Sequence, residues 1–209
     1  MKLILKIPEL LCPEQCCNCH DAPSESFFLC RLCLALLPTQ LRRVKSTGIV
    51  SNICALAPYE GPGGAVIRKF KYQSNLWLGH QLGRRLAVAA KNLERPDLIV
   101  PIPSINRHMM GRGFNPAYVL AKQVSKILKI PCRDNILMRI DPEAQAGRPL
   151  HQRRDKLLSR FELNGVPPSS KILLVDDVHT TGGTIDAAGI TLLNYSCQVS
   201  ALAFASQKL

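Results

Sequence analysis

An aliphatic run that ends in two carboxylates and then in a threonine- and glycine-rich loop constrains this chain more than any other stretch. The stretch is LLVDDVHTTGGT, residues 173–184. Adjacent carboxylates repel each other, and Gly182-Gly183 is a poor beginning for regular structure. Because a segment that breaks several local rules together is typical of a functional site, we treat Asp176, Asp177 and the loop after them as candidate binding residues.

Strand-like and helix-like segments alternate from residue 96 onward. The expected strands are 97–103, 135–140, 171–175 and 199–206, and the expected helices are 115–129 and 184–195. Asn115 is the expected N-cap of the first helix, with Pro116 in its first turn. Residues 171–175 are almost uniformly aliphatic, as expected for a strand covered on both faces. The alternation predicts an α/β domain with a mainly parallel sheet flanked by helices.

The loop after Asp177 has the composition of an anion site. In open α/β sheets, ligands bind beyond the carboxyl ends of the strands, and the helix after Gly183 begins at that edge. A helix N-terminus favours an anion, glycines let the backbone wrap around it, and threonine hydroxyls add donors. Carboxylates beside such a loop suit ribose hydroxyls or a Mg²⁺ ion. The residues therefore predict a sugar phosphate as the ligand.

Six of the nine cysteines fall between positions 12 and 33. Two C-x-x-C pairs stand ten residues apart, and two such knuckles complete a tetrahedral, closed and hence structural zinc site. We expect its ligands to be Cys16, Cys19, Cys30 and Cys33. Three neighbours could replace a ligand, namely Cys12, Cys17 and His20. A redox dithiol remains the alternative to a metal, although clustered cysteines in a cytosolic chain favour the metal.

Residues 173–184 resemble the 5-phosphoribosyl-1-pyrophosphate (PRPP) signature of type I phosphoribosyltransferases. The resemblance implies that Asp176 and Asp177 are the catalytic pair and contact the ribose 2′- and 3′-hydroxyls. It also implies a type I phosphoribosyltransferase-like fold and Mg²⁺ bound together with PRPP. The 5′-phosphate would be held by the loop residues Thr180, Thr181, Gly182, Gly183 and Thr184.

The whole chain resembles the ComF/GntX family of phosphoribosyltransferase-like proteins. The resemblance rests on the cysteine-rich head, on VPIPSINRHMMGRGFNPAYVLA at residues 100–121, and on the acidic signature. Members of this family are associated with DNA uptake and natural competence, alongside a ComF helicase-like partner in some bacteria. The resemblance therefore implies PRPP as ligand and a competence protein or single-stranded DNA as partner.

Phosphoribosyl transfer needs cationic groups for the departing pyrophosphate. The turn after the strand at 97–103 offers Arg107 and Arg112, whose guanidinium groups suit phosphate oxygens, although two surface arginines would look the same. Residues 140–160 occupy the position of the family's flexible loop and carry Arg148, Arg153 and Arg154. KFKYQ, residues 69–73, suits phosphate contact and base stacking or an ordinary amphipathic helix. His179 receives no role.

The net charge of +12 comes from 27 basic and 15 acidic residues and is shared evenly, +6 in residues 1–100 and +6 in 101–209. An evenly basic protein favours anionic partners, either phosphorylated small molecules or nucleic acid, unless the charge is only a solvated surface. No apolar run reaches a membrane span, and the opening segment is too short for a secretory signal, so we expect a cytoplasmic protein.

Three regions are expected: a zinc-binding head at 1–38, a helical connecting region at 39–95 with one helix over 64–92, and a phosphoribosyltransferase-like core at 96–209. Two hypotheses fit them. In the first, the chain is an enzyme that transfers the phosphoribosyl group of PRPP with Mg²⁺. In the second, it keeps PRPP or nucleotide binding but serves as a non-catalytic module that binds single-stranded DNA or competence proteins. Fold alone does not separate the two.

Overall fold

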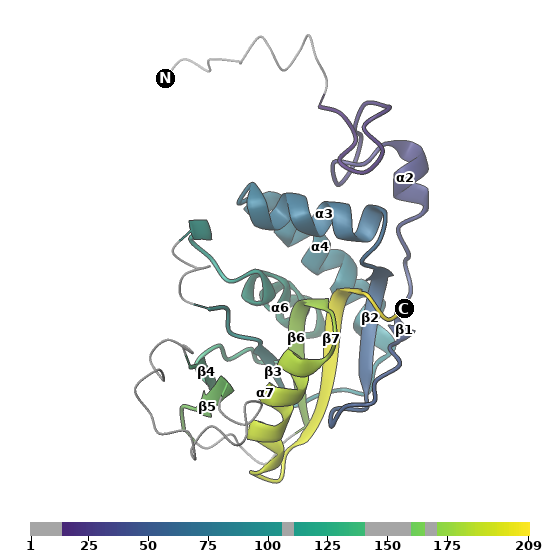
Figure 1. Ribbon diagram of the computed structural model, residues 1–209. Coiled ribbons are helices and arrows are strands. Elements are labelled where there is room, and N and C mark those ends of the chain that lie inside the picture. Colours follow the sequence, from purple (N-terminus) through teal and green to yellow (C-terminus); the bar gives the residue numbers. More distant parts are fainter. Residues whose placement is uncertain (1–13, 106–110, 141–159, 166–170) are drawn as a thin grey trace.

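A computed structural model describes residues 14–105, 111–140, 160–165 and 171–209 (Figure 1). Its centre is a five-stranded sheet of order β1-β2-β7-β6-β3. The strands are β1 (Arg42–Arg43), β2 (Ile53–Pro58), β7 (Gln198–Ser206), β6 (Lys171–His179) and β3 (Leu98–Pro101). Only β1 pairs antiparallel, with β2, and the three other pairings are parallel. The predicted α/β architecture with a mainly parallel sheet is confirmed.

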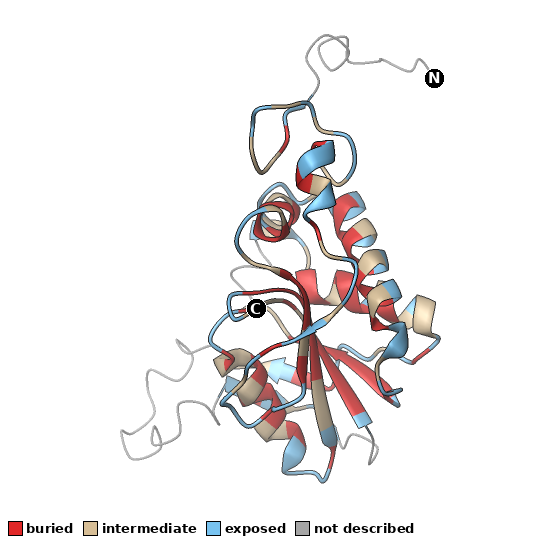
Figure 2. Ribbon diagram, turned by 90° about the vertical axis from the view of Figure 1, so that its right-hand side faces the viewer, coloured by how far each residue is buried: buried red, intermediate tan, exposed pale blue. Residues whose placement is uncertain are grey.

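Helices cover both faces of this sheet (Figures 1 and 2). On one face, Leu173 and Val175 of β6 pack in a core with α3 (Pro62–Tyr72), α4 (Leu76–Ala89) and α6 (Pro116–Leu128). On the other, Ile172 and Leu174 pack with α7 (Gly183–Leu193). Because successive residues of a strand point to opposite faces, covering both faces requires the aliphatic run Ile172–Val175 at the centre of the sheet.

Helix α6 follows the sequence prediction closely. The Asn115 side chain accepts a hydrogen bond from the Ala117 amide at 3.1 Å and so caps the helix. Its amide group also donates to the Ile102 carbonyl at 2.9 Å, just beyond the end of β3. The cap therefore fixes the start of α6 against the carboxyl end of its neighbouring strand.

The single helix predicted over 64–92 is wrong, because the segment forms α3 and α4, followed by the 3₁₀ turn η1 (Ala90–Asn92). The break falls at Ser74, which has a positive φ of 48°, and Asn75 then caps α4 by accepting from the Leu78 amide at 2.9 Å. Gly79 does not interrupt α4. A methyl group there would come within 2.3 Å of the Phe70 ring, so the glycine permits close packing of the two helices.

The region 39–95, expected to be a helical connecting region, contains strands as well as helices. Strand β2 lies within it and joins the main sheet, with Ile53 opposite Ala201 of β7. The segment at 135–140 does contain a strand, β4 (Leu137–Arg139), but this strand pairs antiparallel with β5 (Phe161–Leu163) in a separate two-stranded sheet. The proposed boundaries at 38 and 95 remain predictions, although the sheet draws strands from both sides of residue 95.

The cysteine-rich head lies at one end of the molecule, beyond α3, and includes α2 (Arg31–Ala35) (Figure 1). It contacts the helices through a T-shaped pair of Phe28 and Trp77, with ring centroids 6.1 Å apart. The Arg85 guanidinium of α4 also donates to the Leu37 carbonyl at 2.6 Å. Among the described helices, none combines the length and hydrophobicity that a membrane crossing requires.

Candidate functional site

The two adjacent carboxylates belong to strand β6, which continues four residues beyond the predicted end at 175. Asp176 lies opposite Ala203 of β7, and the strand ends only at His179. Strand alternation sends Asp176 toward the face covered by α7 and Asp177 toward the face covered by α3, α4 and α6. The mutual repulsion that made the pair unusual in the sequence is reduced, because the two side chains occupy different faces.

Asp177 forms an ion pair with Lys71 at the end of α3. The Lys71 Nζ atom lies 2.5 Å from Asp177 Oδ2, and the side chains of Lys71 and Asp177 are only 20% and 10% exposed. Burial lowers the pKa of Lys71, while the nearby Asp176 opposes that shift. Removing one partner of such a shielded pair costs about 3–5 kcal/mol, so the pair firmly ties α3 to β6.

Asp176 is balanced by Arg139 of β4 on the other face. Burial raises the pKa of the Asp176 carboxyl to about 7, and the positive charges of Lys71 and Arg139 act against this rise. The carboxylate Oδ1 accepts the amide of Asp177 at 2.8 Å. Arg139 is held in place by a hydrogen bond of 3.3 Å from its guanidinium to the Pro103 carbonyl. Asp176 therefore changes its charge near neutral pH.

Both carboxylates open into one cavity of about 180 Å³ at the carboxyl ends of β3 and β6. Its cationic lining residues are Lys71, Arg112 and Arg139. Arg112 lies over the Tyr72 ring at 5.2 Å, so the aromatic ring supports its guanidinium at the α3 side. The polar wall after β3 is provided by Ser104, whose hydroxyl donates to Asn115 Oδ1 at 2.9 Å. The cavity thus combines hydrogen-bond acceptors with a surplus of cationic donors.

The threonine- and glycine-rich loop connects β6 to α7 at the same edge. Gly182 has a φ of 94°, a left-handed conformation that favours glycine, and α7 begins at Gly183. Thr184 lines the large cavity together with the acidic pair. A second small cavity of about 10 Å³ is bounded by Asp176 and the loop residues Thr180, Gly182 and Thr184. The structure therefore brings the loop and the acidic pair together, while Thr180 and Thr181 are exposed.

His179, to which the sequence analysis assigned no role, lies beneath this loop. The side chain is 2% exposed, and its Nδ1 lies 3.1 Å from the Ser206 hydroxyl oxygen. Burial lowers the pKa of His179, and the charge of Lys208 lowers it further. A methyl group on Gly182 would come within 3.3 Å of His179 Nε2, so this imidazole forms the floor of the loop.

The four predicted zinc ligands are gathered in the head. The Sγ atoms of Cys16, Cys19, Cys30 and Cys33 all lie within 4.8 Å of one another. The Cys19 and Cys30 sulfurs are 3.8 Å apart, which is about the edge of a tetrahedron with Zn–S bonds of about 2.3 Å. The Asn18 amide donates to Cys33 Sγ at 3.3 Å, as outer hydrogen bonds to metal ligands do. This sulfur-only donor set fits zinc.

The acidic pair fits a resident Mg²⁺ poorly. Mg²⁺ needs carboxylate oxygens that are free to coordinate it, usually together with substrate phosphates. Here the Lys71 ammonium already lies against Asp177 Oδ2, and the positive charges of Lys71 and Arg139 act on Asp176. Of the two alternatives for the carboxylates, ribose hydroxyls or a Mg²⁺ ion, the charges around them therefore favour the hydroxyls, and Mg²⁺ bound together with PRPP stays a prediction.

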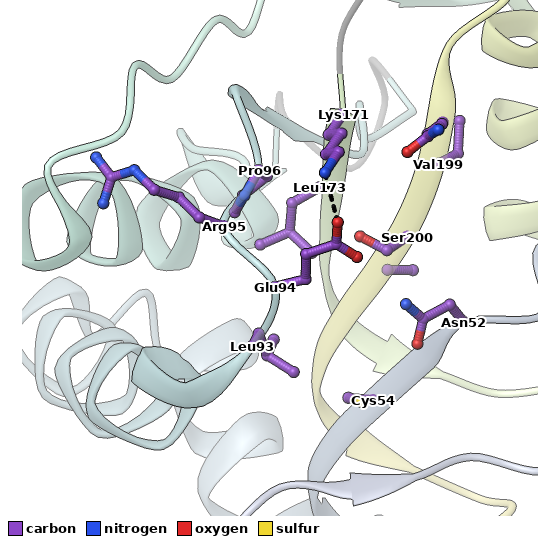
Figure 3. Close-up of a pocket in the computed structure, with 12 residues that line it drawn as sticks. Asn52, Cys54, Leu93, Glu94, Arg95, Pro96, Lys171, Leu173, Val199 and Ser200 are labelled. Atoms are coloured by element: carbon purple, nitrogen blue, oxygen red, sulfur yellow. Dashed lines mark hydrogen bonds and ion pairs between the residues drawn. The ribbon is translucent and has the colours of Figure 1, made fainter.

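A cavity of about 120 Å³ lies at the opposite edge of the sheet (Figure 3). Lys171, the first residue of β6, pairs there with Glu94 at 2.5 Å, and Asn52 and Ser200 stand on the facing wall. This edge carries the amino ends of the parallel strands, where α/β sheets do not usually bind ligands. The sequence signature and this cavity are therefore at different ends of the sheet.

No family model matches the chain. Competence protein F of Haemophilus influenzae is 33% identical over 138 residues, which are 61% of this chain and 60% of that protein, so the match spans less than two thirds of that relative. DNA utilization protein YhgH of Escherichia coli K12 is 27% identical over 90% of this chain and 81% of its own length. Competence protein ComFC of Bacillus subtilis is 31% identical over 51% of this chain and 42% of its own length.

The chain is a relative of the ComF-type proteins. The resemblance predicted from the cysteine-rich head, residues 100–121 and the acidic signature is thereby confirmed. Among solved structures, a purine phosphoribosyltransferase from Pyrococcus horikoshii matches 62% of this chain and 73% of its own, with 15% identity and a TM-score of 0.41.

Two cations of the site, Lys71 and Arg139, were not predicted from the sequence. Lys71 belongs to KFKYQ, which suggested phosphate contact but offered no link to β6, and Arg139 lay in a strand assigned to the main sheet. Of the two predicted arginines, Arg112 lines the cavity and Arg107 lies outside the described residues. The predicted loop over 140–160, with Arg148, Arg153 and Arg154, falls almost wholly outside them, as does Cys12.

The raised pKa of Asp176 makes the stability of this protein depend on pH. The folded carboxyl titrates at about 7 and the free one at 3.8, so the folded state holds a proton that the unfolded state releases. Stability is therefore lost as pH rises through this window. We expect Asp176→Asn to gain stability over the wild type between about pH 4 and 7, with no further gain above.

Urea unfolding of both proteins at a series of pH values measures this difference. The exposed Asp134→Asn is the matched control and should follow the wild type at every pH. A difference between Asp176→Asn and the wild type that stays constant from pH 4 to 8 would contradict the assignment.

Proposed function

We propose that this chain is a PRPP-binding, phosphoribosyltransferase-like protein that serves DNA uptake. The observation that carries the proposal is one cavity at the carboxyl edge of a parallel sheet. It joins the acidic pair, Thr184 at the end of the threonine- and glycine-rich loop, and three cationic side chains. Competence protein F and ComFC support the link to competence by their names, and DNA utilization protein YhgH supports a link to DNA.

The cavity offers complementary partners for each part of PRPP. Carboxylate oxygens of Asp176 and Asp177 would accept hydrogen bonds from the ribose 2′- and 3′-hydroxyls. The backbone of 180–184 at the start of α7, together with its threonine hydroxyls, would hold the 5′-phosphate. Arg112 lines the α3 side of the cavity, where its guanidinium suits the pyrophosphate.

In the enzymatic form of this proposal, an acceptor nucleophile forms a bond to ribose C1 while the C1–O bond to pyrophosphate breaks. Pyrophosphate leaves with the bonding electron pair. The negative charge that grows on it would be stabilised by cationic donors that are already in place, such as Arg112. Positive charge grows on the ribose ring in the same step, close to the carboxylates. Mg²⁺ would supply further neutralisation of the pyrophosphate when it enters bound to PRPP.

Calorimetric titration of Mg²⁺ and PRPP into the wild type and into the double variant Asp176→Asn/Asp177→Asn tests the binding site. We expect the variant to bind at least about tenfold more weakly, because two acceptors of ribose hydroxyls are lost. Removing two negative charges would by itself favour an anionic ligand, so a loss of affinity reports the missing hydrogen bonds. Inorganic phosphate is the control ligand, and its affinity should not fall.

Pyrophosphate release measured on the same samples separates the two hypotheses. Release that requires the acidic pair makes the chain a transferase. Binding without release, in the presence of a panel of acceptors, makes it a sensor or assembly protein. Equal PRPP affinities of wild type and variant would contradict the placement of the ribose.

The cysteine cluster would bind one structural Zn²⁺. Four thiolates fill the tetrahedral shell and leave no position open for catalysis. We expect elemental analysis to find about one zinc per wild-type chain, and Cys30→Ser to lose the metal and lower the melting temperature. Cys17→Ser is the control, because Cys17 lies outside the cluster of four. Well under one zinc per wild-type chain, or equal loss in both variants, would contradict the assignment.

Single-stranded DNA is the second candidate ligand, and two exposed aromatic side chains favour it. Tyr72 is the last residue of α3 and is 71% exposed, and Trp77 is the second residue of α4 and is 58% exposed. Exposed rings on a protein with net charge +12 can stack bases while the charge attracts the phosphates. A ComF-type helicase or another competence protein would then act on the same DNA.

Fluorescence anisotropy with a labelled oligonucleotide, repeated over a range of salt concentrations, tests this second candidate. We expect Tyr72→Ala/Trp77→Ala to weaken binding by about tenfold or more, because each stacked base contributes about 1–3 kcal/mol. Tyr195→Ala removes another exposed aromatic residue and should have no effect. Binding that responds neither to salt nor to the double variant would contradict it.

A further inference from the structure

We propose that Lys71 is the resident counter-ion of the acidic pair, so that the cavity admits an anionic sugar phosphate and excludes free divalent cations. This inference rests on the proposed sugar-phosphate site and narrows what that site accepts. A metal ion would then reach the cavity only in complex with the phosphate groups of a ligand. The motif KFKYQ then supplies, through Lys71, the cation that neutralises Asp177.

The ion pair occupies the atom that a metal would need. Lys71 Nζ lies 2.5 Å from Asp177 Oδ2, within the cavity, and both side chains are largely shielded from water. A divalent ion would have to displace the ammonium group and shed its own water. Mg²⁺ gives up water reluctantly, which makes this exchange costly.

The rest of the cavity wall also favours anions over cations. Three cationic groups and two carboxylates line it, which leaves a surplus of one positive charge among the described lining residues. The positive charge of Arg139 acts on Asp176, and Arg112 lies over the ring of Tyr72 at the end of α3. The pKa of about 7 for Asp176 reduces the negative charge further at neutral pH. A phosphate group is attracted by this wall, and a metal cation is repelled by it.

Lys71 is also distinguished from its neighbour on α3. Lys69, two positions earlier, pairs with Glu14 of the head and lies over the Phe28 ring at 4.4 Å. The two lysines of KFKYQ therefore leave the helix in different directions, one toward the head and one toward the acidic pair. Lys69 provides a matched control of equal charge on the same helical turn.

Two titrations test the inference, each on the full chain. Electron paramagnetic resonance follows the binding of Mn²⁺, used as a probe for Mg²⁺, in the absence of any phosphate. Calorimetry follows ribose 5-phosphate in buffer with a chelator. We expect the wild type to bind ribose 5-phosphate and no Mn²⁺. We expect Lys71→Met to gain a Mn²⁺ site and to lose about tenfold in ribose 5-phosphate affinity, since a charged donor is removed.

Control variants show whether the effects are specific to the charge of Lys71 and to its partner Asp177. Lys69→Met should match the wild type in both titrations, and Lys71→Arg should still exclude Mn²⁺. Adding Asp177→Asn to Lys71→Met should abolish the new Mn²⁺ site. The inference would be overturned if the wild type bound Mn²⁺ and the Asp177→Asn variant did not. This comparison does not depend on whether Lys71→Met folds. Failure of the proposed function gives a different result. In that case the wild type would bind neither PRPP nor ribose 5-phosphate, but Lys71 would still exclude Mn²⁺.

Discussion

The site depends on two successive residues of β6 that carry like charges on opposite faces of the sheet. Each carboxylate needs its own cation, and the chain supplies them from distant segments, Lys71 from α3 and Arg139 from β4. Both segments must therefore reach the carboxyl edge of β6. The ion pair of Lys71 and Asp177 ties the helical layer to the strand at the place where the cavity opens, so packing and site geometry rest on the same contact.

Local patterns in the sequence correctly predicted those parts of the fold that local interactions determine. The cap of α6 by Asn115, the aliphatic run of β6 and the paired cysteine knuckles all depend on residues close together in the chain. Strand β2 and the antiparallel partner of β4 depend on pairings with distant segments, and a short apolar run does not reveal its partner. Lys71 was recognised as a basic residue, but its ion pair with Asp177 could not be predicted because the two residues are far apart in the sequence.

The head and the cavity are connected through one turn of α3. Lys69 contacts Glu14 and Phe28 in the head, while Lys71 contacts Asp177, and Phe28 also packs against Trp77 at the start of α4. A closed Cys₄ cluster has no open coordination position. Its contribution to the cavity would therefore be indirect, by fixing the head against the helices that position Lys71.

Binding of the phosphate groups and turnover place opposite demands on the charge of the cavity. The wall attracts the phosphate groups of a ligand most strongly when Asp176 is protonated, because the wall is then most positive. An oxocarbenium-like ribose is stabilised best when Asp176 is ionised, since its charge then opposes the one growing on the ring. With a pKa of about 7, Asp176 changes between these states near neutral pH. Attraction of the phosphate groups is therefore favoured on the acidic side of this value, and stabilisation of the ribose cation on its alkaline side. The pH dependence of binding and release therefore distinguishes the two functions in physical terms, where the fold alone does not.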